Sequence, residues 1–210
     1  MERRYTLWEP DGFRLFVSHT SSHRHLAGRL GSSLRDYGIS AFVAHNDIEP
    51  SLEWQRIIEE ALKTCDALVA LLTPDFHKSQ WTDQEVGFVL GQPRLVLSIR
   101  LGLDPYGFIG KDQGVPGTRR PHILAGRVFA ALCAAGRTCH ELQRWVIGRL
   151  ASSKDIDDAK RVVGFLEMFS TVTETQAEVI RQVIRANRHV RNSPRLVARL
   201  DKYCQRAVPG

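Results

Sequence analysis

The sequence lacks the features that mark several large protein classes. No apolar run approaches the ~20 residues that a membrane-spanning helix needs, and the opening residues MERRYTLWEPDG contain no apolar stretch typical of a signal peptide. The four cysteines form no CxxC pair, and Cys133, Cys139 and His140 do not match a zinc spacing. We therefore expect a cytoplasmic protein with buried thiols, no membrane association and no metal site.

The composition is otherwise that of an ordinary globular domain, but the charge is unevenly distributed. Residues 1–136 contain 15 Lys/Arg and 15 Asp/Glu, whereas residues 137–210 contain 14 and 8, so the net charge of +6 belongs to the second segment. This asymmetry indicates two units with different roles, or one domain with a basic face.

Short β-rich runs alternate with amphipathic segments over the first hundred residues. Strands are predicted at 13–19, 39–43, 67–72 and 95–101, and helices at 26–34, 51–64 and 81–90. The continuous apolar run 67–72 is typical of a central strand that helices cover on both faces. Residues 102–121 contain five glycines and three prolines and are predicted to form a loop.

After Pro121 only helices are predicted, at 123–135, 141–150, 159–169, 174–189 and 194–204. Ser193 and Pro194 have the pattern of an N-cap followed by proline at the first helical position. The whole order predicts an α/β fold with a flavodoxin-like parallel sheet of four to five strands flanked by helices. We assign residues 1–135 to this domain and residues 136–210 to a helical C-terminal extension.

Ligands of such sheets bind beyond the carboxyl ends of the strands, so the motifs at those ends indicate function. No GxGxxG follows the first strand and no GxxxxGK[ST] occurs, which argues against a dinucleotide-binding dehydrogenase and a P-loop NTPase. A phosphoacceptor receiver would need an aspartate at the end of the third strand, but this strand ends in LLTP.

The motifs FVSHTS, AFVAHNDIEP, DALVALLTPDF, SQWTDQEVGFVLG and LVLSIRLGLDPYGFIG occur in an order that resembles the TIR (Toll/interleukin-1 receptor) domain family, in its bacterial branch. The resemblance covers about residues 11–135 and implies the TIR fold. In the NAD⁺-cleaving members, a helix-borne glutamate four residues after a tryptophan or similar side chain is the catalytic carboxylate. The resemblance places these roles on Glu85 and Trp81.

The spacing of Trp81 and Glu85 suits this chemistry, because residues i and i+4 lie on one helix face and can address the same ligand. Nicotinamide leaves NAD⁺ as a neutral molecule, so its departure needs no general acid. A fixed carboxylate would stabilise the positive charge that builds on the ribose. NAD⁺ would be the substrate, and no cofactor is implied.

Local helix initiation is an alternative explanation of the same residues. Thr82 to Glu85 (TDQE) has the pattern of a capping box, and Trp81 with Val86 has that of a hydrophobic staple. In this interpretation Glu85 starts a helix and has no catalytic role.

Four further positions are predicted to bind substrate: Ser18, His19, Thr20 and Asp47. Ser18, His19 and Thr20 follow the first strand beside a helix N-terminus that would hold a phosphate, although turn formation and capping would also explain them. Asp47 belongs to the segment that corresponds to the BB loop of TIR domains, which flanks the nucleotide site and often mediates self-assembly. The sequence departs from the family here, with Ala44 in place of a frequent acidic residue and Ser51 in place of glycine.

Basic residues recur every three or four positions near the end of the chain. They are Arg181, Arg185, Arg188, Arg191, Arg195, Arg199, Lys202 and Arg206. Such a stripe would bind nucleic acid or another polyanion. A solvated helix face is the favoured alternative, because Tyr203 is the only aromatic residue among them.

The resemblance implies an NAD⁺ nucleosidase or cyclase that makes an ADP-ribose-derived signal, similar to the TIR component of Thoeris-type antiphage systems. It further implies self-association through TIR surfaces, a phage-derived trigger and a downstream effector reached through a nucleotide messenger. The product is left open between ADP-ribose, a cyclic isomer and a conjugate. The alternative from a different class is a non-catalytic TIR adaptor that acts by TIR–TIR assembly.

Overall fold

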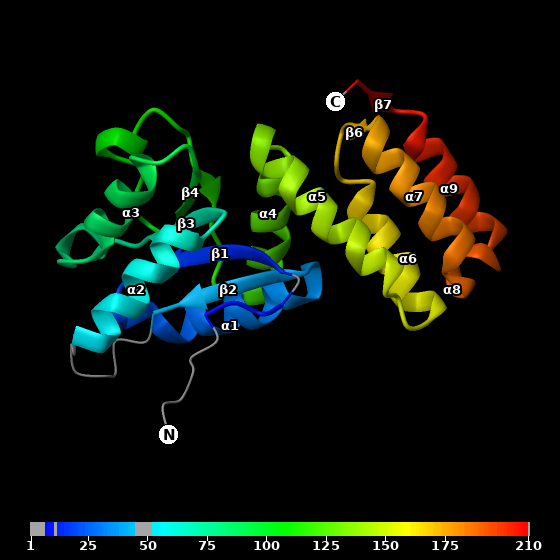
Figure 1. The fold of residues 1–210 in the computed structure, drawn as a ribbon. Coiled ribbons are helices and arrows are strands. Elements are labelled where there is room, and N and C mark those ends of the chain that lie inside the picture. Colours follow the sequence, from blue (N-terminus) through cyan, green and yellow to red (C-terminus); the bar gives the residue numbers. More distant parts are fainter. Residues whose placement is uncertain (1–6, 11, 45–51, 210) are drawn as a thin grey trace. The chain divides into compact units, whose positions relative to one another are not determined.

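The N-terminal half is built on a parallel five-stranded sheet (Figure 1). The computed structural model describes residues 7–10, 12–44 and 52–209. The strands are β1 (Phe13–Ser18), β2 (Ile39–Val43), β3 (Ala67–Leu72), β4 (Leu95–Arg100) and β5 (Val115–Pro116). Their order is β2-β1-β3-β4-β5 and all pairings are parallel, as in flavodoxin-like folds. The prediction of a flavodoxin-like sheet with 67–72 at its centre is confirmed.

Helices cover both faces of this sheet. They are α1 (Arg24–Leu34), α2 (Leu52–Thr64), α3 (Thr82–Leu90) and α4 (Pro121–Cys133). On one face, Phe16 and Leu68 share a core cluster with Ile58 of α2 and Val89 of α3. On the other face α1 approaches β2 so closely that a Cβ on Gly31 would lie 3.1 Å from Cγ2 of Val43. The alternation of side chains along the strands thus separates two apolar layers.

The sheet ends are positioned by the buried central strands. All six residues of β3 are buried, because neighbours on both sides and helices on both faces enclose it. Since β1 and β3 are adjacent and parallel, their carboxyl ends open at the same edge of the sheet. The loops after Ser18 and Leu72 and the start of α3 therefore meet at this edge, where the predicted site residues lie.

Contacts divide the chain into two compact units, Met1–Ala131 and Leu132–Gly210. The helices of the second unit are α5 (Gly136–Ala151), α6 (Ile156–Leu166), α7 (Glu174–Ala186), α8 (Arg188–Arg191) and α9 (Pro194–Cys204). It also contains a short parallel pair, β6 (Val172–Thr173) and β7 (Ala207–Val208). The sequence prediction missed this pair, as it missed β5, because two-residue strands are too short to show alternation.

Side-chain caps decide where several helices of the second unit begin. Asp155 accepts hydrogen bonds from the backbone amides of Asp157 and Asp158 and so starts α6. The predicted helix 174–189 is broken at Asn187, whose side chain caps the separate helix α8. Ser193 caps α9 with Pro194 in the first turn, which confirms that prediction.

The cysteines whose side chains are described, Cys65, Cys133 and Cys204, are free and buried. Burial raises the pKa of the Cys65 and Cys204 thiols, which keeps them protonated at neutral pH. Within the described ranges, no helix combines the length and the apolar character that crossing a bilayer requires.

Candidate active site

Glu85 and Ser18 form a buried pair at the carboxyl edge of the sheet. Only 6% of Glu85 is exposed, and the Ser18 hydroxyl donates a hydrogen bond of 2.5 Å to its Oε2 atom. Ser18 is the last residue of β1 and Glu85 lies in the first turn of α3, 67 positions further along the chain. The fold thus brings two of the predicted site residues into direct contact.

The environment of Glu85 changes its acidity. Burial disfavours the charged carboxylate and raises its pKa from 4.5 to about 7, while the hydrogen bond from Ser18 acts in the opposite direction. The carboxyl therefore exchanges its proton near neutral pH. Perturbation of this kind is typical of groups at functional sites, although buried structural networks also produce it.

The capping-box interpretation of residues Thr82 to Glu85 is wrong. Helix α3 begins at Thr82 with Trp81 as its N-cap residue, and Trp81 makes no side-chain capping hydrogen bond. The Thr82 hydroxyl donates instead to the backbone oxygen of Phe76 at 2.6 Å, outside the helix. The carboxylate of Glu85 accepts from Ser18 and does not cap the helix. Helix initiation therefore does not explain why a glutamate is buried here.

Trp81 lies at the surface one helical turn before Glu85. It is 39% exposed, its backbone oxygen accepts the amide of Glu85 at 2.9 Å, and its own amide donates to Ser79 Oγ at 3.3 Å. These backbone contacts fix the turn while leaving part of the indole ring open to solvent. An aromatic surface is thus available next to the buried carboxyl group.

The loop after β1 contains the other two predicted residues. His19 is buried, and its Nδ1 donates to the backbone oxygen of Val17 at 3.0 Å. The Thr20 hydroxyl contacts Ser22 Oγ at 2.9 Å and His23 Nδ1 at 3.2 Å, and it does not cap the 3₁₀ turn η1 (Ser21–His23) that follows. Capping is therefore not the role of Thr20.

Asp75 is a residue of this edge that the sequence did not single out. Its carboxylate accepts hydrogen bonds from Ser22 Oγ at 2.5 Å and Thr73 Oγ1 at 2.6 Å, and His23 Nδ1 lies at 3.8 Å. The hydrogen bond from Ser22, followed by that from Thr73, lowers the pKa of Asp75 to about 2. Asp75 thus links the loop after β1 to the end of β3. Its position just after the buried strand β3 is the sequence signal that could have identified it.

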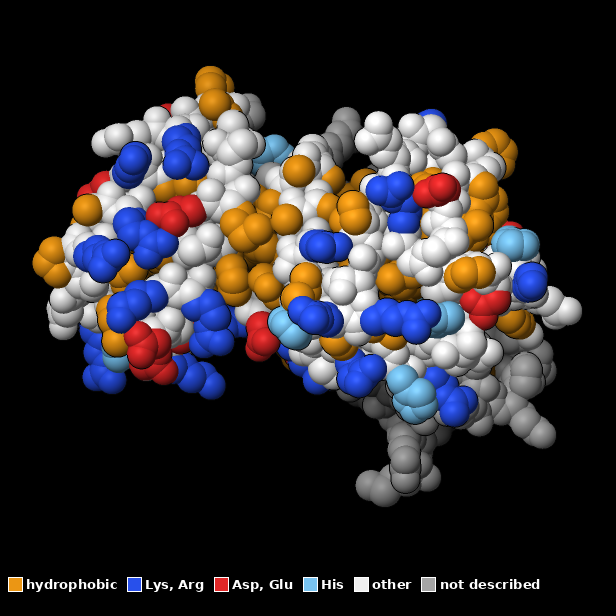
Figure 2. All heavy atoms as spheres, turned by 180° about the vertical axis from the view of Figure 1, so that it is seen from behind, with side chains coloured by type: hydrophobic (Ala, Val, Ile, Leu, Met, Phe, Trp, Pro, Cys, Tyr) orange, Lys and Arg blue, Asp and Glu red, His pale blue; other side chains and the backbone are white. Residues whose placement is uncertain are grey.

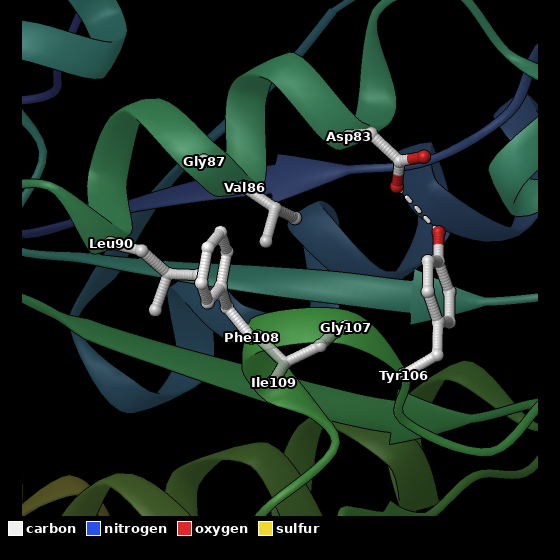
Figure 3. A pocket seen from close by; sticks show the side chains of 8 residues that line it. All are labelled: Asp83, Val86, Gly87, Leu90, Tyr106, Gly107, Phe108 and Ile109. Atoms are coloured by element: carbon white, nitrogen blue, oxygen red, sulfur yellow. Dashed lines mark hydrogen bonds between the residues drawn. The ribbon is translucent and has the colours of Figure 1, made fainter.

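A hollow of about 150 Å³ lies beside α3, between this helix and the loop that follows β4 (Figure 3). Asp83, Val86 and Leu90 line it from the helix, at the i, i+3 and i+7 spacing of one face. Tyr106 borders it from the loop after β4, and its hydroxyl donates to Asp83 Oδ1 at 2.5 Å. Burial raises the pKa of Tyr106, and the hydrogen bond to Asp83 raises it further. Glu85 is not among the residues that line this hollow.

Asp47 and the segment 45–51 lie outside the described residues, so the predicted role of the BB loop stays a prediction. In the part of the chain that the structure describes, no group of three or more His, Cys, Asp or Glu residues is placed to hold a metal ion.

The comparisons with known proteins identify the family. The model of the TIR domain family matches residues 15–120, just over half of the chain, and the chain therefore belongs to this family. No curated protein sequence matches it. Among solved structures, it is similar to the TIR domain of the Toll-related receptor TRR-2 from Hydra magnipapillata. The identity is 18% and the TM-score 0.39, over 46% of this chain and 76% of that one.

Membership of the TIR family supports a TIR-type signalling function. TIR domains in general self-associate and bind NAD⁺, and some of them are NAD⁺ nucleosidases.

Proposed function

We propose that this chain is a TIR-type NAD⁺ nucleosidase or cyclase in which Glu85 is the catalytic carboxylate. The observation that carries the proposal is the burial of Glu85 at the carboxyl edge of a parallel sheet, where ligands of such folds bind. Its carboxyl group caps no helix, is held by a single hydroxyl and has a pKa of about 7. Burying such a group destabilises the fold, which is expected where catalysis requires it.

The reaction needs one carboxylate and no acid for the leaving group. The bond between nicotinamide and C1′ of the ribose breaks, and its electron pair neutralises the nicotinamide ring. Positive charge then develops on the ribose, where ionised Glu85 stabilises it. A water molecule adds to C1′ and loses a proton to give ADP-ribose, or a nucleophile within the ADP-ribose itself gives a cyclic isomer. The cationic nicotinamide ring of the substrate favours the charged form of Glu85, because an opposite charge nearby lowers its pKa.

The remaining residues would bind and orient the substrate. Trp81 would stack against the nicotinamide or another planar part of NAD⁺. Thr20 and the turn after it, fastened by Asp75, would contact the phosphates. Ser18 was predicted from the sequence to bind substrate. Because its hydroxyl donates to Glu85, we propose instead that it positions the carboxylate.

The biological setting that we propose is antiphage signalling. The chain resembles the TIR component of Thoeris-type systems, so a phage-derived trigger would start turnover and a nucleotide messenger would reach a separate effector. This setting rests on the resemblance alone, whereas the proposed chemistry rests on Glu85.

A non-catalytic TIR adaptor is the second candidate. The TIR unit exposes Trp81, Phe88 and Phe108, of which Phe108 is 88% exposed, and exposed aromatic residues favour a protein–protein contact. An adaptor would not need a buried glutamate at position 85. Loss of TIR–TIR assembly in a Phe108→Ser variant, without any NAD⁺ turnover by the parent protein, would support the adaptor.

Nucleic-acid binding through the C-terminal basic stripe is less favoured. Arg181 and Arg185 both pair with Glu178, and Arg199 makes a two-pronged contact with Glu167 at 2.8 and 2.7 Å. These acidic partners interrupt the positive stripe and leave it more like a solvated helix face.

The test is incubation of the purified chain with NAD⁺, with and without phage lysate, followed by measurement of nicotinamide release and identification of the product. The Glu85→Gln variant is the matched comparison. Nicotinamide release by the parent that is lost in the variant supports an enzyme. Equal release by both proteins excludes Glu85 as the catalytic residue.

A further inference from the structure

The first turn of helix α3, which contains Glu85, is not held by a local cap. Its N-cap residue Trp81 makes no side-chain capping hydrogen bond. Helices α6 and α9 differ in this respect, because Asp155 and Ser193 accept hydrogen bonds from backbone amides of their first turns. The position of the first turn of α3 therefore depends on contacts with other parts of the fold.

Three side chains of this turn form hydrogen bonds with three different segments, which are the 3₁₀ turn η3 (Phe76–Lys78), the end of β1 and the loop after β4. The pairs are Thr82 with the backbone oxygen of Phe76 at 2.6 Å, Glu85 with Ser18 at 2.5 Å, and Asp83 with Tyr106 at 2.5 Å. Because each residue turns a helix by about 100°, side chains at positions 82, 83 and 85 point in different directions. The three contacts together therefore fix the rotation of the turn about the helix axis.

The contact of Asp83 differs from those of other surface carboxylates in this chain. Glu59 pairs with Lys63 and Glu141 with Arg144, each within its own helix. Figure 2 shows acidic side chains among the Lys and Arg side chains of the face that it draws. Asp83 accepts instead a hydroxyl group from a residue 23 positions further along the chain. This contact therefore joins α3 to another segment of the fold, which an ion pair within one helix does not.

The Tyr106 side chain is itself held in place by packing. It is partly buried and packs against the core cluster that includes Val86 and Ile109. The ring of His77 meets it edge-on, with a centroid distance of 6.1 Å and an interplanar angle of 82°. Because its pKa is raised, the Tyr106 hydroxyl stays protonated at neutral pH and is a donor to the Asp83 carboxylate (Figure 3). Hydrogen bonds to an ionised acceptor are stronger than neutral ones, so this fixed donor determines where Asp83 lies.

We propose that Tyr106 is a positioning residue, whose hydroxyl acts through Asp83 to hold the first turn of α3 so that Glu85 stays against Ser18. This inference rests on the proposed function, in which Glu85 must face the ribose of NAD⁺. Asp83 lies two residues before Glu85 in the same turn, so a rotation of the turn moves both carboxyl groups. A displacement of about 1 Å at a reacting group can cost about a hundredfold in rate.

The test compares variants of the full chain that remove this contact with one that keeps it. Tyr106→Phe removes the hydroxyl and leaves the ring, and Asp83→Ala removes the acceptor. Asp83→Asn is the conservative variant, because its amide oxygen can accept the same hydrogen bond. Tyr37→Phe is the control, since Tyr37 packs against Phe129 of α4 at a centroid distance of 4.7 Å and loses a hydroxyl there. Circular dichroism verifies the fold of each variant.

Nicotinamide release from NAD⁺ at pH 8 gives kcat and KM for each protein. Tyr106→Phe and Asp83→Ala should each lower kcat by about tenfold with KM within about twofold of the parent, because the groups that bind substrate are unchanged. The double variant should be no slower than either single variant, since both changes remove one contact. Asp83→Asn and Tyr37→Phe should stay within about threefold of the parent. If Tyr106→Phe keeps the kcat of the parent while Glu85→Gln is inactive, the positioning role is overturned and the proposed function stands.

A second measurement needs no turnover. In protein with carbon-13-labelled glutamate, the NMR signal of Glu85 Cδ, assigned by its absence in Glu85→Gln, follows the ionisation of this carboxyl group with pH. The hydrogen bond from Ser18 lowers the pKa of Glu85, so loosening the turn by Tyr106→Phe should move the titration midpoint to higher pH by about 0.5 unit or more. Tyr37→Phe should leave the midpoint where it is. An unchanged midpoint in Tyr106→Phe would overturn the positioning role even if the parent releases no nicotinamide, a result that would count separately against the proposed function.

Discussion

Replacing Glu85 with glutamine should stabilise the protein, and the gain should depend on pH. Burial raises the pKa of Glu85 from 4.5 to about 7 in the folded chain. A carboxyl group with a raised pKa binds more protons when folded than when unfolded. The free energy of unfolding therefore falls as the pH rises from about 4.5 toward 7, and the loss is complete above the folded pKa.

The size of this effect follows from the pKa shift. A change from 4.5 to about 7 is about 2.5 pH units, and each unit corresponds to 1.36 kcal/mol, which gives about 3 kcal/mol. Glutamine stays neutral, and its amide oxygen can accept the same hydrogen bond from Ser18. The advantage of the Glu85→Gln variant should thus grow by about 3 kcal/mol between pH 4.5 and pH 8.

Urea unfolding followed by circular dichroism at several pH values measures this difference. Glu59→Gln is the control, because Glu59 is exposed on α2 and paired with Lys63 at 3.5 Å, so its effect should stay within about 0.5 kcal/mol. If the stability difference between parent and Glu85→Gln is the same at every pH, the carboxyl group does not change its proton affinity on folding. The electrostatic account of Glu85 would then be refuted.

Three further outcomes are expected. Ser18→Ala removes the hydrogen bond that lowers the pKa of Glu85, so the rising limb of kcat/KM against pH for nicotinamide release should move to higher pH. An unmoved limb would show that Ser18 does not act on the carboxylate. Trp81→Ala should raise KM for NAD⁺ by about tenfold with a smaller effect on kcat, and a reversed pattern would argue against stacking. Asn187→Ala removes hydrogen bonds to backbone oxygens at or just after the end of α5 and should lower the unfolding free energy by about 1–3 kcal/mol in urea titrations, whereas no change would mean that water replaces its contacts.

The elements that the sequence predicted best have local signals. The strand 67–72 is apolar throughout, and Gly38 ends the helical segment before β2 in a left-handed conformation, with φ of 75°. β5, β6 and β7 were missed because their two-residue length leaves no pattern and only distant partners define them. The break at Asn187 was missed because the apolar periodicity continues past it, and only the cap shows where α7 ends.

The sequence pointed to candidate residues but not to their contacts. The end of the first strand pointed to Ser18 and the family resemblance to Glu85, whereas their hydrogen bond depends on β1 and α3 meeting at one edge of the sheet. The TDQE pattern suggested a capping box, but the Thr82 hydroxyl donates to the backbone oxygen of Phe76, six residues earlier and outside the helix. Asp75 depends on a tertiary contact, because Ser22, which donates to it, lies 53 positions away in the sequence.

The most direct test of the central claim is the rate of nicotinamide release from NAD⁺ by the parent chain and by Glu85→Gln at pH 8, where Glu85 is ionised. The account predicts turnover by the parent and a fall of about a hundredfold or more in the variant, with the fold retained, because a fixed charge beside the ribose contributes several kcal/mol to the transition state. Cleavage of NAD⁺ by Glu85→Gln at the rate of the parent would contradict it.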